Sequence, residues 1–192
     1  FTGIELGTSS AYNGTKISAS ELTFKPSDTL HLKMINDDML FFQEILRRSS
    51  KRVFVSDNKL EKIYSTNIKV SVEKSNSETS SIKVRKVSEG RNKTKATENA
   101  TGIAYVYQEV ENTLQLNGFF LSHLTYRFSD EVVNATVYIP ENSTVFLDKT
   151  TKSFLYNIAT VDGMYAADMV GHYFKMTYKG LDCTDCIEEP SI

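Results

Sequence analysis

The stretch Val133–Pro140, with the sequence VNATVYIP, decides the fold class. Apolar side chains occupy every second position, and Asn134, Thr136 and Tyr138 stand between them. Successive side chains of a β-strand point to opposite faces, so this spacing predicts a strand with one face buried and the other in water. The turn formers Pro140-Glu141-Asn142 mark the end of the strand.

The same alternation recurs on both sides of this stretch, and helical patterns are scarce. Further strands are predicted at Leu30–Met34, Ile68–Val72, Ile82–Val84, Val145–Leu147 and Phe174–Tyr178, and less regular ones at Lys51–Ser56 and Thr113–Leu121. Only Asp37–Ser50, which also reads as two strand pieces, and Thr94–Ile103 carry helical spacing. The sequence therefore predicts a mainly β protein with at most one or two short helices. Its strand spacing fits a β-sandwich or an irregular β-solenoid.

Composition narrows the range of functions. The 192 residues carry 22 Lys plus Arg against 24 Asp plus Glu, a formal net charge of -2. No basic excess is available to neutralise phosphates, so we expect this domain to contact no nucleic acid. No apolar run is long enough for a membrane span. The chain begins at Phe1 rather than at methionine. This is expected of a cut after a signal or membrane helix, and equally of a trimmed tag or cleaved initiator.

The sharpest local motif is Cys183-Thr184-Asp185-Cys186. Two thiols at this spacing form a structural disulfide, stay inert, chelate a soft metal or act as a redox pair. A zinc site needs further ligands, which His172 and one carboxylate would have to supply. Negative charge from Asp182 and Asp185 disfavours a reactive thiolate. We therefore favour a structural disulfide or inert thiols over a metal or inter-chain contact, and place redox catalysis last.

Catalytic motifs are missing from the sequence. There is no nucleophile elbow, glycine-rich phosphate loop, H-E-x-x-H zinc motif or EF-hand loop. The adjacent carboxylates Asp37-Asp38 and Glu188-Glu189 would face opposite ways on a strand, which makes a poor acid–base pair. We expect no catalytic residue, no cofactor and no enzymatic activity.

The segment Asp168–Cys186 resembles the end of a known family, the C-terminal domain of Bacteroidetes proteins related to phage-shock-protein C (PspC). Those tails follow the pattern [DE]-M-[VI]-G-x-x-[WFY]-x-M-T-x-x-G-L-x-C-x-x-C. The matching residues here are Asp168, Met169, Gly171, Phe174, Met176, Thr177, Gly180, Leu181, Cys183 and Cys186. Phe174 stands where tryptophan is usual. The segments Val137–Asp148 and Phe1–Leu6 also resemble this family, so the resemblance spans essentially the whole chain.

The resemblance implies a fold, a location and a role. The fold would be a ToastRack, an irregular single-stranded right-handed β-helix-like stack. We expect one extracytoplasmic β domain over residues 1–180, or two stacked halves near 1–90 and 91–180, and a tail over 181–192 that carries the Cys pair. The chain would be the periplasmic part of an inner-membrane protein that acts in envelope stress response, a role sometimes labelled stress-responsive transcriptional regulation. The family offers no catalytic residues.

Two non-enzymatic functions follow from these expectations. The first is a sensor or interaction module that contacts envelope proteins, or the membrane part of its own chain, through exposed strand edges. Such edges would also serve a homo-oligomer. The second is an adhesin-like or carbohydrate-binding surface domain, in which Tyr105, Tyr107, Tyr126 and Tyr173 would stack on sugar rings.

Overall fold

The computed structural model describes residues 11–25, 27–36, 52–57, 60–123 and 130–186. These residues form thirteen strands, two short α-helices and one 3-10 helix. The strands are β1 (Tyr12–Glu21), β2 (Leu30–Ile35), β3 (Arg52–Asp57), β4 (Leu60–Ser65), β5 (Ile68–Lys74), β6 (Ser81–Gly90), β7 (Tyr107–Val110), β8 (Thr113–Asn117), β9 (Phe120–His123), β10 (Val132–Ile139), β11 (Thr144–Leu147), β12 (Tyr173–Thr177) and β13 (Gly180–Cys183). The helices are α2 (Lys93–Thr101), η1 (Lys149–Thr151) and α3 (Ala166–Met169).

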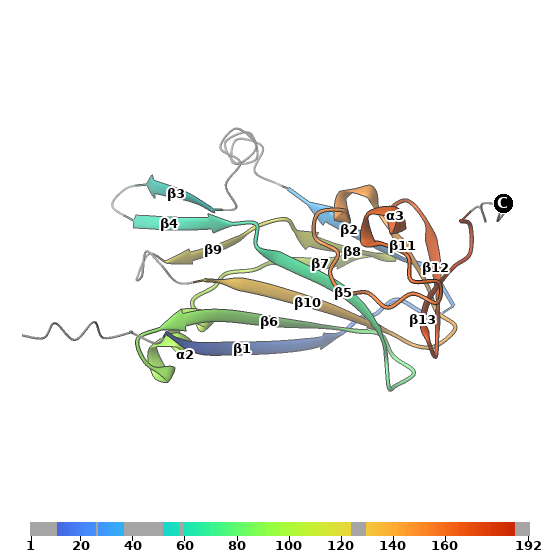
Figure 1. Ribbon diagram of the computed structural model, residues 1–192, viewed down its shortest axis with the longest axis horizontal. Helices are drawn as coiled ribbons and strands as arrows, with labels where there is room; N and C mark the ends of the chain where they lie inside the picture. The colour runs from blue at the N-terminus through green and yellow to red at the C-terminus, as the bar shows by residue number, and fades with distance from the viewer. Residues whose placement is uncertain (1–10, 26, 37–51, 58–59, 124–129, 187–192) are drawn as a thin grey trace, which may run out of the picture.

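The strands form three sheets (Figure 1). The four-stranded sheet has the order β1-β6-β10-β5, the six-stranded sheet β13-β12-β11-β2-β8-β7, and the three-stranded sheet β3-β4-β9. Strand β10 is parallel to β5, and β2 is parallel to both β11 and β8. Parallel neighbours in both large sheets are typical of a stacked, solenoid-like fold, and the antiparallel pairs make the stack irregular. The predicted fold class is confirmed.

The core lies between the two large sheets and follows from the alternation in the sequence. In β10, Val133, Ala135, Val137 and Ile139 are fully buried, while the residues between them are half-buried. They belong to one apolar cluster with residues of the six-stranded sheet, such as Leu32 of β2. Burial of this apolar surface is the main favourable term that holds the sheets together.

Helix α2 caps one end of the four-stranded sheet. The Asn92 side chain caps its first turn by accepting a hydrogen bond from the Lys95 N–H at 2.8 Å. Its buried residues, Ala96 and Ala100, lie over β1 and β6. The helix predicted at Thr94–Ile103 is thus present, but it begins one residue earlier and ends two residues earlier. The other candidate helix, Asp37–Ser50, lies outside the described residues.

Two strands have other limits than the sequence predicts. The predicted strand Thr113–Leu121 is two strands, β8 and β9, because the chain turns at Asn117-Gly118 and enters another sheet. Strand β13 crosses the predicted boundary between domain and tail, with Leu181 fully buried in the core. The division at residue 180 stays a prediction. No helix in the described part of the chain is long and apolar enough to span a bilayer.

Candidate functional site

The Cys motif lies at the edge of the six-stranded sheet, on the hairpin formed by β12 and β13. Phe174 pairs with Cys183 in this hairpin, and Met176 pairs with Leu181. Cys183 is joined to Cys186 by a disulfide, with a Cα–Cα distance of 5.7 Å that is normal for such a bond. Their roles in metal binding or redox chemistry stay predictions.

His172 and Asp185 lie beside this disulfide. The His172 Nδ1 atom is 3.4 Å from Asp185 Oδ1, a contact without hydrogen-bond geometry. The same Oδ1 atom accepts a hydrogen bond from the Tyr173 N–H at 2.9 Å. One ligand atom from each of His172, Cys183, Asp185 and Cys186 lies within 4.8 Å of all the others. The hairpin therefore brings together the ligand set that the spacing of the motif would require.

Most of the remaining motif residues have structural roles. Met169, Phe174, Met176 and Leu181 are buried in the core, whereas Asp168 is exposed on α3. The motif glycines, Gly171 and Gly180, have φ angles of 87° and 123°, which L side chains rarely adopt. The Thr177 hydroxyl donates to the Gly180 carbonyl at 2.7 Å and closes the hairpin turn. Most residues of the motif therefore stabilise the fold at this edge of the six-stranded sheet.

The three described tyrosines among those proposed to stack on sugars, Tyr105, Tyr107 and Tyr173, do not form one exposed surface. Tyr105 is only 9% exposed, so its predicted availability is wrong, and burial raises the pKa of its hydroxyl. The Tyr107 hydroxyl shares a hydrogen bond of 2.8 Å with Ser20. Tyr173 is partly exposed and packs on Phe146, with ring centroids 4.7 Å apart. Tyr126 lies outside the described residues.

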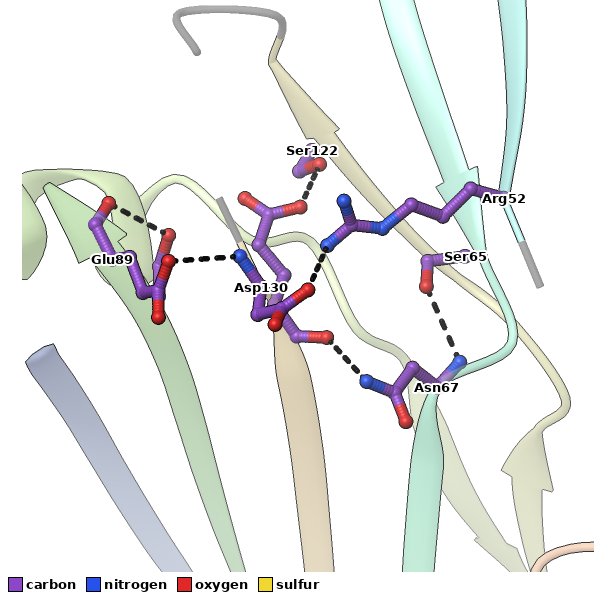
Figure 2. Close-up of polar contacts among 8 residues, drawn as sticks. Arg52, Ser65, Asn67, Glu89, Ser122 and Asp130 are labelled. Atoms are coloured by element: carbon purple, nitrogen blue, oxygen red, sulfur yellow. Dashed lines mark hydrogen bonds and ion pairs between the residues drawn. The ribbon is translucent and has the colours of Figure 1, made fainter. Parts of the chain in front are cut away.

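A second cluster, the polar junction, lies where the four-stranded and three-stranded sheets meet (Figure 2). It comprises Arg52, Ser65, Asn67, Ser88, Glu89, Ser122, Asp130 and Glu131. The Ser122 hydroxyl donates to the Glu131 carboxylate, and the Asn67 amide donates to the Glu131 carbonyl at 2.8 Å. The Arg52 guanidinium, from β3, points toward Asp130 and lies 3.8 Å from its carboxylate. These contacts tie β10 to β9, β3 and the entry to β5.

Glu131 is the electrostatically unusual member of the polar junction. It is 3% exposed, and burial raises the pKa of its carboxyl above the ordinary value of 4.5. Hydrogen bonds from Ser122 and Ser88 and the charge of Arg52 favour the ionised form but do not cancel the effect of burial. The junction can therefore hold a proton that a solvated glutamate would lose.

The sequence carries a signal for Glu131 that belongs to no catalytic or metal-binding motif. Glu131 precedes Val133 by two positions, so it is in phase with the buried residues of β10. Period-two alternation extended by one step places this carboxylate on the buried face. An acidic residue in phase with a buried apolar run is a candidate for a perturbed pKa.

We expect Glu131→Gln to change how stability depends on pH. In the window above 4.5 and below the raised pKa, the folded state holds a proton that the unfolded state has lost. Stability therefore falls as the pH rises through this window and stays low above it. Glutamine does not titrate and keeps an acceptor for the Ser122 hydroxyl. The melting temperature of the variant should therefore rise relative to that of the wild type as the pH increases. A gain of about 2 °C or more, measured by circular dichroism, corresponds to ~1 kcal/mol in a domain of this size.

The control for this prediction is Asp130→Asn, a neighbouring carboxylate whose side chain is 87% exposed. Its melting temperature should follow that of the wild type across the same pH range. A difference between wild type and Glu131→Gln that stays constant with pH would contradict the raised pKa.

Comparison with known proteins identifies the family of the chain. The search of curated proteins and that of solved structures both gave no match. One family model, described as the ToastRack found in some PspC, matches residues 55–189. This family is a structural β domain and not a known enzyme family. The match begins within β3 and leaves β1 and β2 outside it, and the predicted Bacteroidetes origin stays a prediction. Because the matched region is more than half of the 192 residues, the chain belongs to the family of ToastRack domains found in some PspC proteins.

Proposed function

We propose that this domain is a non-enzymatic sensor and interaction module in the extracytoplasmic part of a PspC-related inner-membrane protein, acting in envelope stress response. Membership of the ToastRack family supports the PspC context. The near-neutral net charge of -2 supports protein partners over nucleic acid. The module would act by bringing copies of the chain together.

The observation that carries this proposal is the edge strand β1. It pairs with β6 over all ten of its residues and is the outermost strand of its sheet (Figure 1). Within the described part of the chain, no strand pairs with its outer edge. Nine of its ten residues are exposed. Natural proteins usually shorten or cover such edges, and a long open edge offers backbone donors and acceptors for strand addition.

The sequence of β1 fits a second copy of the same chain. If β1 of a second copy extends the sheet in antiparallel fashion, residues that lie opposite each other must point to the same face of the sheet. The two-fold axis that relates the two copies must therefore pass through a residue of β1 and not between two residues. An axis at Ile17 places this 54% exposed side chain opposite its copy, and Lys16 opposite Ser18. An axis at Lys16 would place two like charges opposite each other, which is unfavourable. The register centred on Ile17 is therefore the one that we propose.

We expect the chain to form a reversible dimer that Ile17→Glu weakens. The substitution replaces an apolar pair at the axis with two facing carboxylates, so the dissociation constant should rise at least about tenfold, equivalent to ~1.4 kcal/mol. Sedimentation velocity over a range of protein concentrations measures this constant.

The matched control is Val161→Glu, which makes the same kind of change at a 46% exposed residue away from β1. It should leave the dimer unchanged. A chain that stays monomeric at every concentration, or two variants that weaken the dimer equally, would contradict assembly through β1.

A further inference from the structure

We propose that reduction of the Cys183–Cys186 disulfide creates a Zn²⁺ site whose ligands are His172, Cys183, Asp185 and Cys186. Metal binding at this site does not depend on dimerisation through β1. The further statement that metal binding is the signal detected by the sensor rests on the function proposed above. The β12–β13 hairpin would then have two states, one in which a disulfide joins the two Cys residues and one in which both bind a metal ion.

The ligand set is complete and closely spaced. Two Cys residues separated by two others are the commonest spacing in structural zinc sites, and one histidine and one carboxylate complete a set of four. The four ligand atoms lie within 4.8 Å of one another. Tetrahedral zinc with bonds of about 2.0–2.3 Å holds its ligands roughly 3.3–3.8 Å apart, so shifts of about 1 Å bring them onto a metal. Thiolate sulfur together with imidazole favours zinc over magnesium or calcium.

His172 has an unsatisfied nitrogen in the right place. Its Nδ1 atom is buried, and no described residue makes a hydrogen bond to it. A buried polar atom without a hydrogen bond costs free energy, which a metal–nitrogen bond would recover. Nδ1 faces Asp185 Oδ1 at 3.4 Å, which is already the separation of two ligands on one tetrahedral zinc ion.

The loop that carries Asp185 is held by contacts other than the disulfide. The Tyr173 N–H donates to Asp185 Oδ1 at 2.9 Å, and a donor of this kind orients a ligating carboxylate. The Tyr173 carbonyl accepts from both the N–H and the hydroxyl of Thr184, at 2.9 and 3.1 Å. Because these bonds fasten the loop to β12, the ligands remain near one another after the disulfide is opened.

The chemistry balances with an external dithiol as the reductant. One thiolate of the dithiol attacks Cys183 or Cys186, the S–S bond breaks and a mixed disulfide forms. The second thiolate of the dithiol then releases the chain, so two electrons pass to the Cys pair and the reductant becomes a disulfide. Zn²⁺ binding then displaces the two thiol protons into solvent. Two thiolates and the Asp185 carboxylate offset the charge of the ion and leave the site with a net charge of about -1.

The test is metal titration of the chain in both redox states without any affinity tag. The chain is reduced with a phosphine under nitrogen and titrated with CoCl₂, and ZnCl₂ then competes for the site. The reduced chain should bind one equivalent of Co²⁺ with thiolate charge-transfer and tetrahedral absorption bands, and Zn²⁺ should abolish them. The oxidised chain should show neither band. Absence of a stoichiometric complex in the reduced chain would overturn the proposal.

Two variants leave the Cys pair intact and identify the other ligands. His172→Gln and Asp185→Asn should each lower Zn²⁺ affinity by at least about tenfold, the smallest loss typical even of residues that only support a ligand. The matched control is Asp182→Asn, a neighbouring exposed carboxylate outside the ligand set, which should bind as the wild type does. If all three variants bind equally, the proposal is wrong. Dimerisation is measured on the oxidised, metal-free chain, so either proposal can fail without the other.

Discussion

Replacing Phe174 with alanine is expected to lower the free energy of unfolding by about 3–5 kcal/mol. The Phe174 side chain is fully buried and belongs to the core cluster between the two large sheets. It lies on β12 opposite Val145 of β11 and Cys183 of β13. Removal of the ring loses its burial and leaves a cavity that the surrounding strands can close only in part. Urea denaturation followed by circular dichroism measures the change.

The control is Tyr178→Ala, which removes an aromatic ring one position beyond the end of β12. Tyr178 is 71% exposed, so the cost should stay within about 0.5 kcal/mol, the range of ordinary surface substitutions. Equal losses for the two variants would mean that the motif aromatic does not anchor the core.

The alternation of apolar residues predicted individual strands well because it reports local burial. Val133 to Ile139 are buried at the positions that the pattern indicated. The pattern could not reveal which strands pair, since β2 contacts β8 and β11, far away in the sequence. Those contacts depend on which apolar faces fit together, a property of the whole chain. The predicted strand Thr113–Leu121 ran across the break at Asn117-Gly118 because apolar residues continue past that turn.

The candidate site was predictable only in part for a similar reason. The Cys spacing indicated a disulfide or a metal site, and His172 with one carboxylate was the set that a metal would need. That Asp185 is the carboxylate facing His172 depends on the register of the β12–β13 hairpin, in which Phe174 pairs with Cys183. Tyr105 was expected at the surface, although its phase with Ile103, which is also buried, favoured the interior.

Replacing Gly14 with alanine is expected to cost at least about 3 kcal/mol, the upper end of overpacking effects in well-packed cores. Gly14 is the buried residue of β1, and α2 crosses directly over it. A Cβ atom at this position would lie 2.1 Å from the backbone carbonyl carbon of Ala96 and 2.2 Å from the backbone nitrogen of Thr97. Rotation of a side chain cannot relieve a clash with helix backbone, so β1 and α2 must separate. Chemical denaturation measures the loss.

Gly102→Ala is the matched control because it makes the same substitution at the C-cap of α2, the helix that lies over Gly14. Gly102 has a φ angle of -73°, which alanine adopts without strain, and the nearest atom to its new Cβ would be 3.4 Å away. Alanine there should be neutral or stabilise the fold by up to about 1 kcal/mol, because it restricts the unfolded chain. Hydrogen exchange adds a second measurement, since separation of α2 from β1 in Gly14→Ala should speed exchange in β1 and α2 before the core strand β10. Unchanged stability in Gly14→Ala would show that α2 does not rest on the backbone of β1.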